Sequence, residues 1–350
     1  APIALILCSC ACGWATEAPK PCAPHAGPAA AALLRYLAQL PQRDSARCLT
    51  GQAVGANGDV KQAREYFQKH IEELDRVSGK RPVVLDYCPT RRSGATLDRV
   101  ELQAMQDEIL ARSREGHLVY MNVRLPHPLG MDHVTGNRKS GYHIGDMDTV
   151  ARPDGVHYKA FRQGLDYYAD FITPLEEAGV VLLFQLYNEL NGDWEMTGKL
   201  KPDEFKKLYR YTFDYFARER KARNLLFVLE YAANMLPPEK IPAKEYYPGD
   251  DCVDIVGFDF YNDDPKDKYV DVYRQILEFG KPVAMTEFGP DQTAYRRKRG
   301  IEWKDWLEKS VQVWDNLIQS DFTKRFYPRC CFFIRWSGDW AIASQKNARE

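Results

Sequence analysis

The sequence lacks an excess of charge of either sign, and it lacks a hydrophobic run long enough to cross a membrane. Its 350 residues include 48 lysines and arginines against 49 aspartates and glutamates, which gives a formal net charge of −1. A nearly neutral chain has no field to attract nucleic acid or an anionic membrane. The first apolar run covers about a dozen residues, too few for a transmembrane helix. We therefore expect no nucleic-acid partner, no transmembrane segment, and a substrate that is uncharged or small.

Metal-binding spacing is also missing among the later cysteines. Five of the nine cysteines lie at or before Cys48, and the other four lie in apolar, strand-like runs. These four are Cys88, Cys252, Cys330 and Cys331. Buried free thiols are the expected state of such residues.

The first 45 residues differ in composition from the rest. A short apolar run passes into a segment rich in Ala and Pro, as in a secretory signal, although the charged start and Met of such a signal are missing. We expect residues 1–45 to hold a truncated export signal and a linker. Leu7-Cys8-Ser9-Cys10 weakly resembles a lipoprotein cleavage site, so the expected protein is secreted or periplasmic, with a surface lipoprotein as the alternative.

From residue 46 on, short apolar runs alternate with longer amphipathic ones, which is typical of βα units and a parallel sheet. The predicted strands cover 48–52, 81–88, 117–124, 180–189, 225–232, 252–261, 281–289 and 330–338. Predicted helices lie between them, over 60–79, 97–116, 158–179, 201–224 and 303–322. Eight strands over this length predict one (β/α)8 barrel over residues 46–345 without a second domain. We expect it to act as a monomer.

Polar residues close several of these strands. In such a barrel the active site lies at the carboxyl ends of the strands. Asn188 and Glu189 end the fourth strand, and Glu287 ends the seventh. With a side-chain period of two, Val283 and Met285 are expected to share the inward face with Glu287. The sixth and eighth strands are expected to turn two further sets inward. These are Ile255, Gly257, Asp259 and Tyr261, and Phe332, Ile334 and Trp336.

Two carboxylates at one barrel mouth suit glycoside hydrolysis, in which one protonates the leaving oxygen and the other attacks the anomeric carbon. Their environments must differ so that one stays protonated and the other ionised. Tyr261 could hold Glu287 ionised by donating a hydrogen bond, and Asn188 could bind the sugar 2-hydroxyl. The expected catalytic residues are thus Glu189 and Glu287. Expected to bind substrate are Asn188, Trp194, Tyr261, Trp336, Arg124 and Asp259.

Motifs at these positions resemble those of glycoside hydrolase family 26, best known for β-mannanases. They are ELNGDW (189–194), YYPGDDCVDIVGFDFY (246–261), KPVAMTEFG (281–289), LTGQ (49–52) and the segment 201–228. The resemblance implies a (β/α)8 barrel and a retaining mechanism with Glu189 as acid/base and Glu287 as nucleophile. It also implies that Tyr261 lies beside the nucleophile and that Trp336 forms the floor under the sugar. Cleavage of β-1,4-mannan follows as the expected activity, with a polysaccharide or oligosaccharide as the partner and neither cofactor nor metal.

Some positions depart from the family pattern. The family usually carries R-x-x-H-E in the strand-four motif, and here Gln185 and Asn188 stand in place of the Arg and His. Val123 and Arg124 stand where the family commonly has Trp and His, and Glu195 follows Trp194 where further Trp residues are usual. The catalytic pair is kept and the mannan-specific subsite changes. Xylan or mixed-linkage glucan is therefore an alternative substrate, and a non-catalytic carbohydrate-binding barrel is an alternative class.

Two further features leave alternatives open. Glu230 closes the fifth strand and is either a third carboxylate of the site or the partner of Arg223 or Arg124. The long segment 125–155 contains His127, His133 and His143, whose spacing matches no zinc pattern. A segment of this length after the third strand is expected to overhang the cleft.

Overall fold

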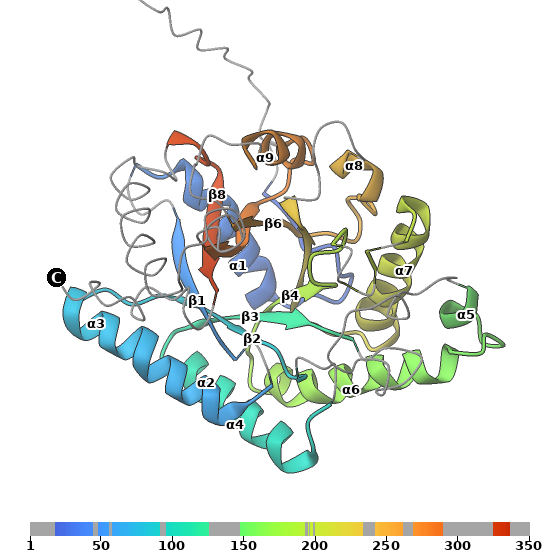
Figure 1. The fold of residues 1–350 in the computed structure, drawn as a ribbon, viewed down its shortest axis with the longest axis horizontal. Helices are drawn as coiled ribbons and strands as arrows, with labels where there is room; N and C mark the ends of the chain where they lie inside the picture. The colour runs from blue at the N-terminus through green and yellow to red at the C-terminus, as the bar shows by residue number, and fades with distance from the viewer. Residues whose placement is uncertain are drawn as a thin grey trace, which may run out of the picture.

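The chain forms a closed barrel of eight parallel strands surrounded by helices (Figure 1). The computed structural model describes residues 18–44, 48–55, 58–91, 96–125, 148–192, 195, 197–198, 200–233, 242–261, 269–289 and 325–336. The strands are β1 (Leu49–Gly55), β2 (Val84–Tyr87), β3 (Leu118–Val123), β4 (Leu182–Leu186), β5 (Leu225–Tyr231), β6 (Ile255–Tyr261), β7 (Val283–Gly289) and β8 (Cys330–Arg335). Each strand pairs with the next in chain order, and β8 pairs with β1. The predicted (β/α)8 barrel and all eight predicted strands are confirmed.

Helices follow most strands and cover the outside of the barrel. They are α2 (Val60–Phe67), α3 (Glu73–Ser78), α4 (Arg99–Arg114), α5 (Asp148–Ala151), α6 (Tyr158–Glu177), α7 (Pro202–Asp214), α8 (Ala243–Tyr246) and α9 (Tyr269–Leu277). One π-helical turn, Gln68–Glu72, joins α2 to α3, and another, Tyr215–Glu219, extends α7. Four predicted helices are confirmed, and the fifth, 303–322, lies outside the described residues.

Alternate residues of each strand face the barrel interior and the helices. Val84, Tyr120 and Leu183 belong to the inner cluster, whereas Leu85 and Val119 belong to the cluster under the helices. The strands are thus buried on both faces, which explains their nearly continuous apolar sequences. The predicted inward faces of the sixth and eighth strands agree with the inner positions of Ile255, Phe332 and Ile334.

For β7 the predicted face is wrong. Ala284 lies in the inner cluster, whereas Val283 and Met285 pack in the outer one. The register between β6 and β7 shifts by one residue, because Phe258 pairs with Met285 and Asp259 pairs with Glu287. Thr286 is the extra residue of this bulge, which returns Glu287 to the side of the barrel interior.

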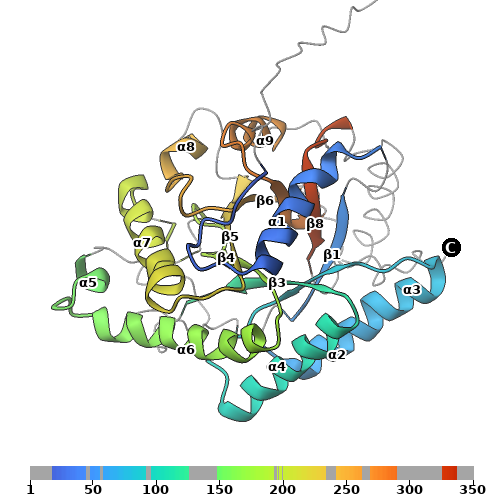
Figure 2. The same cartoon turned by 180° about the vertical axis from the view of Figure 1, so that it is seen from behind.

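Helix α1 (Pro28–Gln39) closes the amino-terminal end of the barrel, as Figure 2 shows. Its buried residues Ala30, Leu34 and Leu37 join the inner cluster at the starts of the strands. The segment before α1 is also attached, since the Cys22 backbone N–H donates to Asp254 Oδ1 over 2.7 Å. The linker predicted up to residue 45 is therefore folded in its second half. Residues 1–17, where the export signal was predicted, lie outside the described residues.

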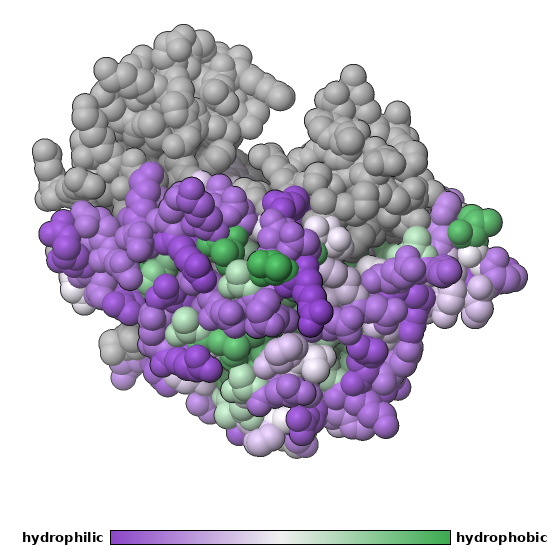
Figure 3. Space-filling model, turned by 90° about the horizontal axis from the view of Figure 1, so that it is seen from below, coloured by the Kyte–Doolittle hydropathy of each residue, from purple (hydrophilic) through white to green (hydrophobic). Residues whose placement is uncertain are grey.

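The outer surface of α2, α4 and α6 is mainly hydrophilic (Figure 3). Val100 and Val156 are the exposed large hydrophobic residues of the described chain. Within the same ranges, every helix is too short or too polar to span a bilayer. Cys88, Cys252, Cys330 and Cys331 are buried free thiols, as predicted.

Candidate active site

The predicted acid/base residue lies in a strained turn directly after β4. Tyr187 has a φ of 63° and Glu189 a φ of 41°, both in the left-handed region that residues other than glycine seldom adopt. Each such residue costs about 1–3 kcal/mol and persists only where its surroundings hold it. The Tyr187 hydroxyl lies 2.6 Å from Thr212 Oγ1 of α7, which fixes one end of the turn.

The end of β5 holds the other end of this turn. Glu189 N–H donates to Glu230 Oε2 over 3.1 Å, and Leu190 N–H donates to the Glu230 carbonyl over 3.3 Å. Asn191 and Ala232 exchange two hydrogen bonds of 3.0 and 2.8 Å. The turn that carries Glu189 is therefore fastened to the neighbouring strand at three successive residues.

Glu230 is a third carboxylate of the site. It is completely buried and accepts a hydrogen bond from Gln185 Nε2. Arg223, one alternative partner, binds Glu176 instead. Burial, followed by the charge of Glu189, raises the pKa of Glu230 to about 8.

Asn188 is oriented by an asparagine that the sequence reasoning missed. Asn122 on β3 donates from Nδ2 to Asn188 Oδ1 over 2.5 Å. The Asn188 amide nitrogen consequently points toward Glu189 Oε2 and Glu195 Oε1, at 3.4 and 3.3 Å. A polar residue two positions after the inward-facing Tyr120, in an otherwise apolar strand, is the signal that could have identified Asn122.

The predicted nucleophile, Glu287, is buried and receives the expected hydrogen bond. Tyr261 Oη donates to Glu287 Oε2 over 2.8 Å. This bond and the Arg124 charge favour the ionised carboxylate, but burial and the charges of Glu189 and Glu230 outweigh them and raise the pKa of Glu287 well above its usual range. Because Glu189 is its strongest charged neighbour, the two predicted catalytic carboxylates act on one another electrostatically across the barrel mouth.

Asp259 lies beneath these residues and is only 1% exposed. One carboxylate oxygen accepts the Ala233 N–H, and the side chain also bonds Glu189. Burial and the Glu189 charge raise the pKa of Asp259 well above its usual range. Asp259 therefore contacts Glu189, and its contact with the substrate stays a prediction.

Trp336 follows β8 at the rim of the inner cluster and is partly buried. Its backbone is held from both sides, since its N–H donates to the Phe288 carbonyl over 3.1 Å and its carbonyl accepts from Gln52 Nε2 over 3.0 Å. The backbone of Trp336 is thereby attached to β7, the strand that carries Glu287. Its role as a platform under the sugar stays a prediction.

Arg124 lies at the end of β3, facing the acidic residues. Tyr168 Oη makes two hydrogen bonds to the Arg124 backbone. It accepts from the Arg124 N–H over 2.9 Å and donates to the Arg124 carbonyl over 3.0 Å. Burial disfavours the guanidinium charge, but the surrounding acids raise its pKa. Arg124, Asn188 and Glu195 line a cavity of about 20 Å³, enough for about one water molecule.

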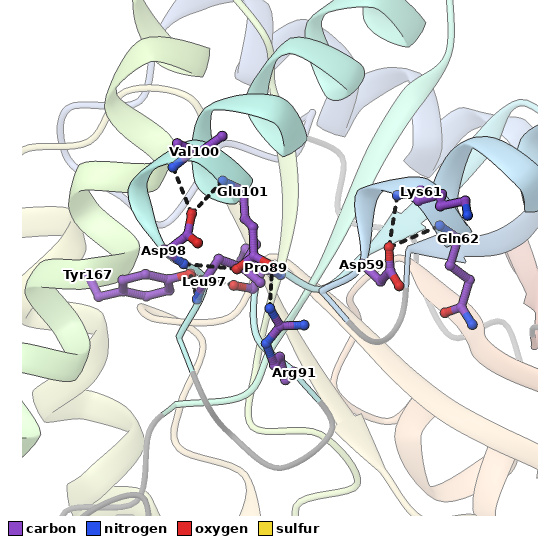
Figure 4. A network of polar contacts seen from close by, with 10 residues as sticks. All are labelled: Asp59, Lys61, Gln62, Pro89, Arg91, Leu97, Asp98, Val100, Glu101 and Tyr167. Carbon is purple, nitrogen blue, oxygen red and sulfur yellow. Dashed lines mark hydrogen bonds and ion pairs between the residues drawn. The ribbon is translucent and has the colours of Figure 1, made fainter.

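The rim of the mouth beside β1 and β2 is held by helix caps (Figure 4). Asp59 caps α2, and Asp98 forms a capping box with Glu101 at the start of α4. Tyr167 Oη accepts from Leu97 N–H over 3.1 Å and donates to the Pro89 carbonyl over 2.6 Å. Pro89 and Leu97, which both precede α4, are thus bound to the same side chain of α6.

Two sequence predictions lie outside the described residues. Trp194 is one, and the segment 126–147 with His127, His133 and His143 is the other. Among the described residues, no group of His, Cys, Asp and Glu is arranged to hold a metal ion.

A parallel (β/α)8 barrel with two interacting carboxylates at the carboxyl ends of β4 and β7 defines the architecture of a glycoside hydrolase. The chain belongs to glycosyl hydrolase family 26, whose family model matches residues 22–346.

Two relatives of the chain are named for their activity on mannan. Mannan endo-1,4-beta-mannosidase A and B of Caldalkalibacillus mannanilyticus is 26% identical over 93% of this chain and 59% of its own length. The mannan endo-1,4-beta-mannosidase of Bacillus subtilis is 24% identical over 99% of this chain and 90% of its own. The chain therefore spans 59% of the first relative and most of the second.

Solved structures agree on the fold. A mannanase of Bacillus subtilis superposes with a TM-score of 0.74 at 22% identity, covering 95% of this chain and 92% of that one. A beta-mannanase from a symbiotic protist of the termite Reticulitermes speratus, in complex with a gluco-manno-oligosaccharide, gives 0.71 at 22% identity, with 94% and 90% covered. At this identity the likeness shows the shared barrel.

Proposed function

We propose that the protein is a retaining endo-acting hydrolase of β-1,4-mannan, with Glu189 as acid/base and Glu287 as nucleophile. The observation that carries the proposal is the meeting of these two carboxylates at one barrel mouth, with Tyr261 bound to Glu287. The mannan-active relatives support the choice of substrate.

In the first step Glu189 protonates the glycosidic oxygen while Glu287 attacks the anomeric carbon, so that the leaving sugar departs with a proton and a glycosyl-enzyme ester forms. In the second step Glu189 takes a proton from water, which displaces Glu287 and restores both residues. The Tyr261 hydrogen bond and the Arg124 charge stabilise ionised Glu287 before attack. The Asn188 amide nitrogen, turned toward Glu189, is placed to donate to the sugar 2-hydroxyl.

The departures from the family pattern differ in whether they face the substrate. Gln185 is fully buried between Tyr120 and Glu230, so its replacement of the family arginine changes the support of the site. Asn188 and Arg124 lie at the mouth and change what faces the sugar. Hydrolysis of mannan, glucomannan, xylan and mixed-linkage glucan, measured as reducing ends released, tests the substrate. We expect turnover of mannan and glucomannan; a preference for xylan or mixed-linkage glucan would contradict the mannan assignment.

Two substitutions test the roles. Glu287→Ala should abolish turnover of every substrate. Glu189→Ala should still form the glycosyl-enzyme with an aryl glycoside whose leaving group needs no proton, and azide should trap it as a product of retained configuration. Glu278→Ala, which removes an exposed glutamate just before β7, serves as the control and should match the wild type. Equal inactivity of Glu189→Ala on natural and activated substrates would overturn the assignment, and a wild-type protein that binds these glycans without cleaving them would indicate a binding barrel.

A further inference from the structure

Glu230 makes contacts that the catalytic steps above do not use. It lies near the end of β5, is completely buried, and its Oε2 accepts from both the Glu189 backbone N–H and Gln185 Nε2. Gln185 Oε1 in turn accepts from Tyr120 Oη over 2.7 Å. A chain of hydrogen bonds thus runs from β3 through β4 to β5 and reaches the main chain of the acid/base residue.

The donors fix the direction of this chain of hydrogen bonds. Tyr120 donates to the Gln185 oxygen, which leaves the Gln185 amide nitrogen to donate to Glu230. Only an oxygen at the Glu230 position can accept from both Gln185 and the Glu189 N–H. Without it, two buried N–H donors would lose their partner, which costs about 1–3 kcal/mol for each group.

The geometry at Glu189 makes this acceptor matter for catalysis. Glu189 has a φ of 41°, and relaxation to an ordinary backbone conformation would redirect its side chain away from the glycosidic oxygen. Asp259 contacts the carboxylate of Glu189, whereas Glu230 contacts its backbone. Contacts to the backbone set the direction of the Cα–Cβ bond, and among those that hold this turn the bond to Glu230 Oε2 is made by the N–H of Glu189 itself.

We propose that Glu230 is a positioning residue of the active site, whose buried carboxyl group holds the main chain of Glu189 in its left-handed conformation and so aims the acid/base at the glycosidic oxygen. This inference deepens the proposed function and rests on it.

The substitutions follow from what Glu230 supplies. Glu230→Gln keeps one acceptor oxygen, and because burial raises the pKa of Glu230 to about 8, the neutral amide resembles the carboxyl at neutral pH. Glu230→Ala and Glu230→Met remove the acceptor, the second while filling most of the space. Asp254→Ala is the matched control, since Asp254 is a buried acid at the opposite end of the barrel that accepts the Phe227 N–H over 2.8 Å.

If Glu230 positions the acid, its loss should slow the natural substrate more than an activated one. In Glu230→Ala and Glu230→Met, kcat on polysaccharide should fall about 10- to 100-fold with KM within about threefold of wild type. The burst of aryl leaving group from an activated glycoside should change less than about threefold, because that step needs no acid. Glu230→Gln should stay within about threefold on both substrates. Asp254→Ala should lower stability and keep the ratio of the two activities at the wild-type value.

A second readout does not depend on activity. Amide hydrogen exchange at Glu189 should speed up at least tenfold in Glu230→Ala or Glu230→Met and keep the wild-type rate in Glu230→Gln and Asp254→Ala. Equal losses on both substrates, wild-type activity without the acceptor, or unchanged exchange at Glu189 would each overturn the inference. If the wild-type protein hydrolyses no glycan, the proposed function fails, and the exchange measurement still decides whether Glu230 holds Glu189.

Discussion

At the scale of single residues, the charge state of Glu287 results from opposing contacts. The Tyr261 hydroxyl and Arg124 favour its ionised form, while burial, Glu189 and Glu230 favour the neutral form. Tyr261 therefore favours the ionised nucleophile, as expected, but the contacts that favour the neutral form are stronger. Arg124 and Tyr261 are the two contacts that favour ionisation of Glu287, so the loss of either would make its ionised form less stable.

Tyr261→Phe should lower kcat/KM on polysaccharide about 10- to 100-fold, the value of one hydrogen bond to a charged group. Since the lost bond lowers the pKa of Glu287, its removal raises that pKa further, and the acid limb of the pH profile should move to higher pH. Tyr231→Phe, which removes a buried hydroxyl bonded to the Ala243 carbonyl, should leave the profile in place. An acid limb unchanged in Tyr261→Phe would contradict this account.

Sequence reasoning found most of the polar residues near the strand ends and missed Asn122 on β3. Glu189, Tyr261 and Glu287 follow apolar runs, so their position at the barrel mouth could be inferred from the fold. Asn122 and Asp86 lie inside short strands. Alternation from Tyr120 could have placed Asn122 on the inner face, but the sequence does not show which face Tyr120 itself occupies.

At the scale of elements, the bulge in β7 decides which way Glu287 points. A regular strand with Ala284 inside would also turn Thr286 inward and Glu287 outward. The period-two rule predicted the inward glutamate for the wrong reason, because it placed Val283 and Met285 inside with it. Alternation alone could not reveal the extra residue.

Gly257 on β6 makes room for this bulge, since an added Cβ would lie 2.5 Å from Thr286 Cγ2 and 2.6 Å from its Oγ1. Gly257→Ala should lower the free energy of unfolding by about 1–3 kcal/mol, as overpacking does, and should reduce kcat by displacing Glu287. Urea unfolding and steady-state kinetics measure both effects.

The double variant Gly257→Ala/Thr286→Ala removes the two closest atoms and should recover more than half of the lost stability. Thr286→Ala alone is the control. Additive losses in the double variant would show that the two residues do not compete for this space.

At the scale of the whole molecule, the described part of the barrel buries several carboxyl groups. Asp86 on β2 is buried, and burial raises its pKa from 3.8 to about 7, with Arg124 opposing the shift. A folded pKa above the unfolded value means that this contribution to stability is fully present below about pH 4 and is lost as the pH rises toward 7.

Asp86→Asn removes this titration. The free energy of unfolding of the variant, relative to wild type, should therefore rise between pH 4 and pH 7.5, by about 4 kcal/mol if the whole shift is expressed. Urea unfolding of both proteins at the two pH values provides the measurement, and contributions shared by both proteins, such as that of His70, cancel in the comparison. A difference between the two proteins that stays constant with pH would show that Asp86 does not titrate in this way.

Helix α1 is made before every strand of the barrel, yet the surfaces it covers belong to strands made much later. Its leucines pack with Leu226 of β5 and Phe332 of β8, about 190 and 300 positions further along the chain. During synthesis the apolar side of this helix therefore stays exposed until β8 has been made. The barrel closes and α1 becomes fully buried only after β8 has been made. A nascent chain halted before β8 would therefore expose an apolar surface of the kind that chaperones bind.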